Sequence, residues 1–60
     1  MNVYDIRIKM YEENKEKIII QDYKTAKELD VIYCYDDYYD NFNVEMIEIE
    51  ENKLVLIVGD

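Results

Sequence analysis

The run Leu54–Val58 places the strongest constraint on the fold of this 60-residue chain. Its residues are Leu-Val-Leu-Ile-Val, and a strand that is apolar on both faces must be covered on both. The length allows one domain, residues 1–60, and a domain of about 60 residues buries only about 60% of the surface that its unfolded chain exposes. We therefore expect a small, marginally stable domain whose core contains this strand.

Three other segments predict strands. Tyr4–Met10 alternates apolar and polar residues, which is typical of a half-buried strand, and Ile18 begins a second strand that ends near Tyr23. The polar stretch 12–16 between them predicts a hairpin loop. From Phe42 to Ile49 the alternation changes phase at Met46-Ile47, which predicts a bulge or a strand that begins there, and 51–52 predicts a turn.

A helix is predicted from Thr25. Thr25-Ala26-Lys27-Glu28 has the form of a capping box, in which side chains of the first and fourth residues bond each other's backbone N–H. The helix would place Ala26, Leu29, Ile32 and Tyr33 on one face. Its end stays open between Asp30 and Asp40, because 31–35 is rich in strand formers. The expected fold is α+β: a four-stranded antiparallel sheet with one helix packed on one face, in the order ββαββ.

The charge is concentrated in the second half of the chain. Residues 1–29 hold six acids and six bases, whereas residues 30–60 hold nine acids and only Lys53, which gives the whole net charge of −8. A surface built from the second half repels nucleic acid and acidic membranes and attracts basic grooves. We expect no nucleic-acid or membrane partner.

The composition argues against several classes of function. The chain has no His and one cysteine, so neither a disulfide framework nor a structural zinc site is expected, and the acids lack the spacing of a calcium loop. Cys34 has no His partner and is expected to be a small buried side chain. No segment predicts a membrane span or a signal peptide, so we expect a cytoplasmic protein that is not an enzyme and binds no cofactor or metal.

One cluster of residues is a candidate partner-binding surface. Tyrosines are enriched at interfaces, and carboxylates crowded together favour a basic partner. The cluster therefore predicts a surface that imitates nucleic acid, in which carboxylates take the place of phosphates and aromatic rings the place of bases. The alternative is a solvated face whose tyrosines pack on the sheet or on a second subunit. Its residues are Asp30, Tyr33, Tyr35, Asp36, Asp37, Tyr38, Tyr39 and Asp40.

A second candidate is the acidic row near the end of the chain. Glu48 and Glu50 are two residues apart, so on a strand they project to one face about 6.7 Å apart. A row of this kind can occupy a groove that normally receives phosphates. The alternative is an exposed face or edge kept soluble by its acids.

Part of the chain resembles a known family. Tyr4-Asp5-Ile6, Glu12-Glu13-Asn14, Asp22-Tyr23-Lys24 and 29–33 (Leu-Asp-Val-Ile-Tyr) are similar in order and spacing to the short phage-encoded inhibitors of uracil-DNA glycosylase, over about residues 3–35. The resemblance implies an acidic, dimeric DNA mimic that begins with two strands and a helix and plugs an enzyme pocket with an aromatic side chain. Leu29 stands at the plug position and Tyr33 at a second family aromatic, so Leu29, Tyr33 and Tyr35 are the candidate anchors.

These patterns lead to one hypothesis with two alternatives. The chain is expected to inhibit a DNA-binding enzyme of a host or of a defence system by docking into its basic DNA-binding groove, with uracil-DNA glycosylase as the first target. The first alternative is an anti-CRISPR protein that blocks the groove of a Cas nuclease. The second is a homodimeric structural or interaction module without an inhibitory role.

Overall fold

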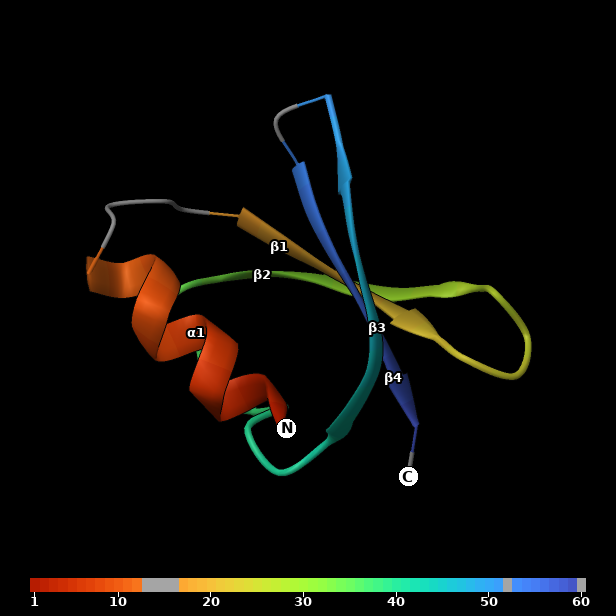
Figure 1. The fold of residues 1–60 in the computed structure, drawn as a ribbon, viewed down its shortest axis with the longest axis horizontal. Coiled ribbons are helices and arrows are strands. Elements are labelled where there is room, and N and C mark those ends of the chain that lie inside the picture. The colour runs from red at the N-terminus through yellow and green to blue at the C-terminus, as the bar shows by residue number, and fades with distance from the viewer. Residues whose placement is uncertain (13–16, 52, 60) are drawn as a thin grey trace.

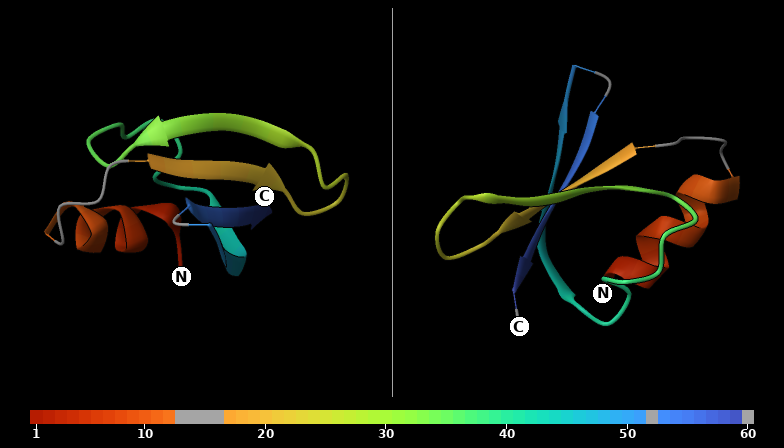
Figure 2. Two further views of the ribbon diagram at one scale, coloured as in Figure 1. Left: turned by 90° about the horizontal axis from the view of Figure 1, so that it is seen from above. Right: turned by 180° about the vertical axis from the view of Figure 1, so that it is seen from behind.

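A helix precedes four strands in this small α+β protein. The structure is a computed structural model that describes residues 1–12, 17–51 and 53–59. The elements are α1 (Val3–Glu12), β1 (Lys17–Asp22), β2 (Glu28–Tyr33), β3 (Asn43–Glu50) and β4 (Lys53–Gly59). The strands form one twisted sheet in the order β2-β1-β4-β3, and α1 lies against one face of it (Figures 1 and 2). The order is therefore αββββ, and the predicted ββαββ order is wrong.

The sheet is mixed rather than antiparallel. β1 pairs antiparallel with β2, and β3 pairs antiparallel with β4, as expected for strands that follow each other closely. The two central strands, β1 and β4, are parallel. This arrangement arises because the segment 34–42 carries the chain from one outer strand to the other, passing along α1 (Figure 2, right).

The predicted strand at Tyr4–Met10 is the helix α1. The buried residues of this helix are Val3, Arg7 and Met10, which are three and four residues apart. The segment therefore fits the period of a helix as well as the alternating pattern of a strand. A capping box starts the helix: the Asn2 N–H donates to Asp5 Oδ2 (3.0 Å) and the Asp5 N–H to Asn2 Oδ1 (3.2 Å). These reciprocal bonds satisfy backbone N–H groups at the start of the helix that have no partner within it.

The predicted capping box at Thr25 does not start a helix. Thr25 donates from both its N–H (2.8 Å) and its hydroxyl (2.9 Å) to Asp22 Oδ2, and Ala26 takes a positive φ of 61°. These features close the turn between β1 and β2. The two bonds lower the pKa of Asp22, because they favour its carboxylate form. The residues that follow are the strand β2, so the helix predicted from Thr25 is wrong and 31–33 are extended.

The remaining strand predictions are confirmed with small shifts. The predicted strand from Ile18 is β1, and the predicted last strand is β4, in which Leu56 and Val58 are fully buried. The phase change in β3 is a bulge between Val44 and Met46, one residue earlier than predicted. The predicted hairpin loop 12–16 begins with Glu12, which is the last residue of α1, and its residues 13–16 lie outside the described residues. In the predicted turn at 51–52, Glu51 is a turn residue and residue 52 lies outside the described residues.

The core lies between α1 and one face of the sheet. The register places Ile32, Ile18, Leu54 and Ile49 in one row across the four strands on this face. Ile32 and Ile18 are buried with Cys34 in the core cluster, as expected for that cysteine, whereas Ile49 at the other end of the row is 79% exposed. The helix therefore covers the β2 side of its face and leaves the far end of β3 bare.

The opposite face of the sheet, which α1 does not cover, is also apolar at its centre. Ile19, Val55 and Ile57 share this face with Val31 and Met46 on the outer strands. Val55 and Ile57 are buried by their neighbours because β4 is an inner strand, whereas Val31 and Met46 are about half exposed. Within the described residues, no helix has the length and apolar character needed to cross a bilayer.

Candidate protein-binding surfaces

A buried ion pair holds the segment 34–42 against α1. Arg7 Nε and Nη2 donate to the two carboxylate oxygens of Asp40 at 2.7 and 2.6 Å, and Arg7 Nη1 donates to the Cys34 carbonyl at 3.0 Å. The Asp40 hydrogen bonds raise the pKa of Arg7, although burial opposes the shift. The bidentate geometry favours a fixed orientation of the segment on the helix.

Backbone bonds add to this attachment at the start of the helix. The Val3 N–H donates to the Phe42 carbonyl (3.0 Å), and the Tyr4 N–H donates to the Asp40 carbonyl (3.2 Å). Both donors belong to the first turn of α1, where backbone N–H groups have no partner within the helix. The segment therefore caps the helix as well as pairing with Arg7.

Arg7 is a structural residue that the sequence pattern did not single out. It lies four residues after Val3 and three before Met10, so the helical spacing of buried positions includes it. That spacing is a sequence signal that Arg7 is buried. The prediction of a strand at 4–10 instead assigns Arg7 to a solvated face. The sequence predicts its partner Asp40 as one of the acids available to another protein, but in the structure the Asp40 carboxylate pairs with Arg7.

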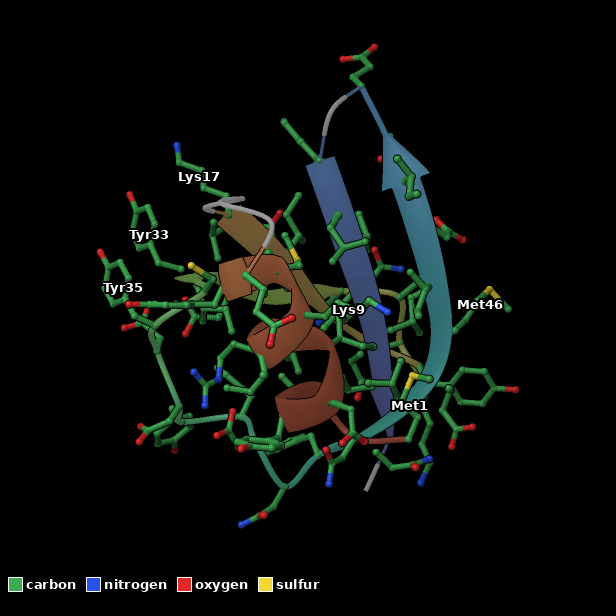
Figure 3. The ribbon with its side chains drawn as sticks, turned by 60° about the vertical axis from the view of Figure 1, so that its left-hand side comes forward. Met1, Lys9, Lys17, Tyr33, Tyr35 and Met46 are labelled. Carbon is green, nitrogen blue, oxygen red and sulfur yellow. The ribbon has the colours of Figure 1, made fainter. Side chains whose placement is uncertain are left out.

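The tyrosines predicted as binding residues form two ring contacts. The rings of Tyr33 and Tyr35 are stacked, with centroids 5.4 Å apart and an interplanar angle of 3°. They lie side by side at one side of the molecule, with Met46 on the other (Figure 3). Tyr39 packs edge-on between Tyr38 (4.9 Å) and Phe42 (5.1 Å). Tyr39 itself packs against the core, as in the alternative in which the tyrosines pack on the sheet.

Two aspartates of the cluster bond to β2 and its surroundings. Asp36 Oδ2 accepts from the Tyr33 N–H (2.9 Å), and Asp30 accepts from the Val31 N–H (2.8 Å) and from the Tyr39 hydroxyl (3.2 Å). Partial burial and the bond to Asp30 together raise the pKa of Tyr39. Both aspartates thus order the backbone around them.

A set of accessible tyrosines and aspartates lies at the end of β2 and directly after it, and we call this set the tyrosine–aspartate surface. Tyr35 and Tyr38 are 65% and 80% exposed, and Asp37 is exposed between them. Among the described residues, the only ion pair is Arg7–Asp40, so no lysine in the described ranges pairs directly with these aspartates. The surface consists of Tyr33, Tyr35, Asp36, Asp37 and Tyr38.

The glutamates of the second candidate lie elsewhere. Glu48 and Glu50 are on β3, at the other edge of the sheet from β2. β3 runs away from the segment 34–42, and at about 3.3 Å per residue its eight residues extend for roughly 25 Å. The structure thus divides the predicted acids between two separate surfaces. Glu48 and Glu50 share one face, as predicted, because they oppose Val55 and Lys53 in register.

Leu29, the predicted plug, is apart from the tyrosines. It is the extra residue of a bulge in β2, between the pairs Ile20–Asp30 and Gln21–Glu28, and it is about half exposed. It lies at the start of β2, whereas Tyr33 lies at its end. Tyr33 and Tyr35 are therefore the candidate anchors that the structure places beside the aspartates.

Across 1–12, 17–51 and 53–59, no group of three His, Cys, Asp or Glu side chains is arranged to hold a metal ion. Comparisons with protein-family models, with curated proteins and with solved structures give no match.

Proposed function

We propose that the protein inhibits a DNA-binding enzyme by placing the tyrosine–aspartate surface in the enzyme's basic DNA-binding groove. Asp36 and Asp37 take the place of phosphates, and Tyr33, Tyr35 and Tyr38 supply flat amphipathic area. The observation that carries this proposal is the combination of exposed rings with two aspartates that form no ion pair among the described residues, although Asp37 interacts electrostatically with Arg7. Asp40 is not one of the proposed phosphate surrogates, because its carboxylate is paired with Arg7.

The charge of the whole chain supports the same partner. A net charge of −8 on a small protein steers it toward a positive surface and speeds association at low salt. The partner is thus a basic groove that normally binds DNA. Uracil-DNA glycosylase is the first target to test, and a Cas nuclease is the second.

An inhibition assay with each enzyme tests the proposal. We expect Asp37→Lys and Tyr35→Ala each to weaken inhibition about tenfold, because they reverse a phosphate surrogate or remove an anchor near the centre of the surface. Matched controls are Glu50→Lys on β3 and Tyr23→Ala in the β1–β2 turn, which reverse an acid and remove a tyrosine outside the surface. Inhibition should also weaken as salt increases. Full activity of both enzymes in the presence of the protein excludes those targets.

A homodimeric interaction module is the second candidate. The observation in its favour is the face opposite α1, where Val31 and Met46 leave apolar surface exposed beside the buried Val55 and Ile57. Sedimentation of the protein and of the Val31→Lys variant tests it. A dimer that Val31→Lys dissociates supports this candidate, and a monomer at all concentrations rejects it.

A further inference from the structure

The two outer strands differ in what their free backbone edges contact. On β2, the N–H groups of Val31 and Tyr33 donate to the carboxylates of Asp30 and Asp36. The Tyr33 carbonyl also accepts from the Asp36 N–H at 3.0 Å. These bonds occupy three of the backbone groups that another strand would need, so the end of β2 is a poor template for further pairing.

The edge of β3 is covered only at its beginning. There the Val44 N–H donates to the Met1 carbonyl (2.9 Å), and Asn2 forms an isolated bridge with Asn43. From Met46 to Glu50 no group of the described residues bonds to the outer side of the strand. Because backbone groups alternate in direction along a strand, about half of those in this stretch point to the free edge.

The side chains that flank this free edge have two different characters. On the α1 side, Ile47 and Ile49 are 44% and 79% exposed. On the opposite side, Glu48 and Glu50 project from the same strand, with Met46 at the beginning of the stretch. A strand added here would therefore meet apolar side chains on one face and carboxylates on the other.

We infer that the edge Met46–Glu50 of β3 is a β-augmentation site for an extended segment of a partner protein in which basic and apolar side chains alternate. Backbone hydrogen bonds attach the segment to the edge, and cross-strand pairs select its sequence. Its basic side chains lie next to Glu48 and Glu50, and its apolar side chains next to Ile47 and Ile49. This site is separate from the tyrosine–aspartate surface and goes beyond the proposed function.

Charge indicates that the occupant is a different protein rather than a second copy. Each copy carries −8, and pairing two β3 edges would bring their glutamates together. The segment Ile6–Met10 of this chain does alternate apolar and basic residues. It forms part of α1, however, and its Arg7 is held by Asp40, so it is not available as a strand.

Amide hydrogen exchange with a short peptide probe tests the site. The probe alternates Lys and Val, and a control peptide has the same composition with the lysines and valines in separate blocks. We expect the alternating peptide to slow exchange of amides within Met46–Glu50 and to leave β2 unchanged, with a weaker effect from the control. Equal effects of both peptides, or no protection in this stretch, overturn the inference.

A pair of variants distinguishes edge pairing from general attraction to an acidic protein. Ile49→Lys changes an exposed side chain, so the fold is retained, but it places a positive charge where the apolar side of the probe must lie. The matched control is Leu29→Lys on β2. We expect about tenfold weaker binding for Ile49→Lys and less than about twofold for Leu29→Lys, because only the first alters cross-strand contacts.

Two further results contradict the inference. Equal loss of binding in both variants shows that the peptide responds to charge alone. A peptide-free dimer that Ile49→Lys dissociates assigns the edge to a second copy. Neither result bears on the inhibition assay, in which Ile49→Lys should behave as the unchanged protein, so failure here is distinguishable from failure of the proposed function.

Discussion

β2 and β3 are both outer strands of one sheet, and both carry carboxylates, but the carboxylates act differently. At the free edge of β2, backbone N–H groups donate to Asp30 of the strand and to Asp36, which follows it in the chain. On β3 the side chains of Glu48 and Glu50 project from one face, and the edge beside them is uncovered. One outer strand is closed by its own acids, and the other is open.

The difference shows how side-chain length and position decide the role of an acid. An aspartate is short enough to bond backbone groups close to it in the chain, whereas glutamates that alternate along a strand extend into solvent. The segment 34–42 reinforces the closed side by joining β2 to α1 through Arg7 and Asp40. The largest fully buried side chains lie on α1 and on the inner strands β1 and β4.

The largest expected effect comes from breaking the ion pair on the closed side. Arg7→Ala leaves the Asp40 carboxylate without its partner in a site where the two side chains are only 10% and 19% exposed. We expect a loss of about 3 to 5 kcal/mol in the free energy of unfolding, measured by urea denaturation. Because that loss approaches the stability of a small domain, Arg7→Ala is also expected to lower the amount of folded protein.

A double variant gives the control. Arg7→Met with Asp40→Leu removes both charges and keeps apolar volume, so it should recover most of the stability. A double variant as unstable as Arg7→Ala would show that the hydrogen bond from Arg7 to the Cys34 carbonyl, rather than the unpaired charge, dominates the loss.

The second prediction compares the two ends of one row across the sheet. Ile32 on β2 is 3% exposed and Ile49 on β3 is 79% exposed, although both face the α1 side. Ile32→Ala should cost about 2 to 4 kcal/mol, because it leaves a cavity in the core. Ile49→Ala should change the free energy of unfolding by less than about 0.5 kcal/mol. Similar losses at both positions would contradict the description of β3 as the open side.

The third prediction tests how β2 is closed. Asp36→Ala removes the acceptor for the Tyr33 N–H and should cost about 1 kcal/mol and speed exchange of that amide. Asp36→Asn keeps a side-chain oxygen in place and should retain most of the protection. If both variants exchange alike, charge rather than hydrogen bonding protects this edge.

The smallest effect concerns Tyr39. Its pKa lies above the ordinary value of 10.0, mainly because of partial burial and next because of the bond to Asp30, so folding favours the protonated phenol. Its contribution to stability is complete below pH 10.0 and is lost as pH rises through the raised pKa. Tyr39→Phe cannot ionise and should flatten that part of the stability–pH curve. An unchanged slope in this variant would assign the alkaline loss to other groups.

Particular elements show how much of the fold the sequence predicts. The apolar run in β4 and the strand from Ile18 were predicted because their residues favour one structure strongly. Tyr4–Met10 was mistaken for a strand because its apolar residues fit both periods, and only packing on the sheet selects the helix. Thr25 was mistaken for a helix start because its bonds to Asp22 close a turn instead.

The candidate site was predicted in composition but not in arrangement. The tyrosines and aspartates of 33–38 lie together in the structure because they are close in the chain. The wide separation of Glu48 and Glu50 from them depends on strand order, which local patterns do not specify. The pairing of Arg7 with Asp40 joins residues 33 positions apart and has no signature in either segment.

Sequence alone determined that this chain is a small acidic α+β protein with a buried strand near its end, since composition and local apolar patterning depend only on which residues are neighbours. Tertiary structure decided that α1 packs over Ile32 of β2 and leaves Ile49 of β3 exposed. It also decided which acids bond to the backbone at the edge of the sheet and which remain exposed. Those outcomes depend on contacts between distant segments, whose free energies are of the same size as the local preferences that they override.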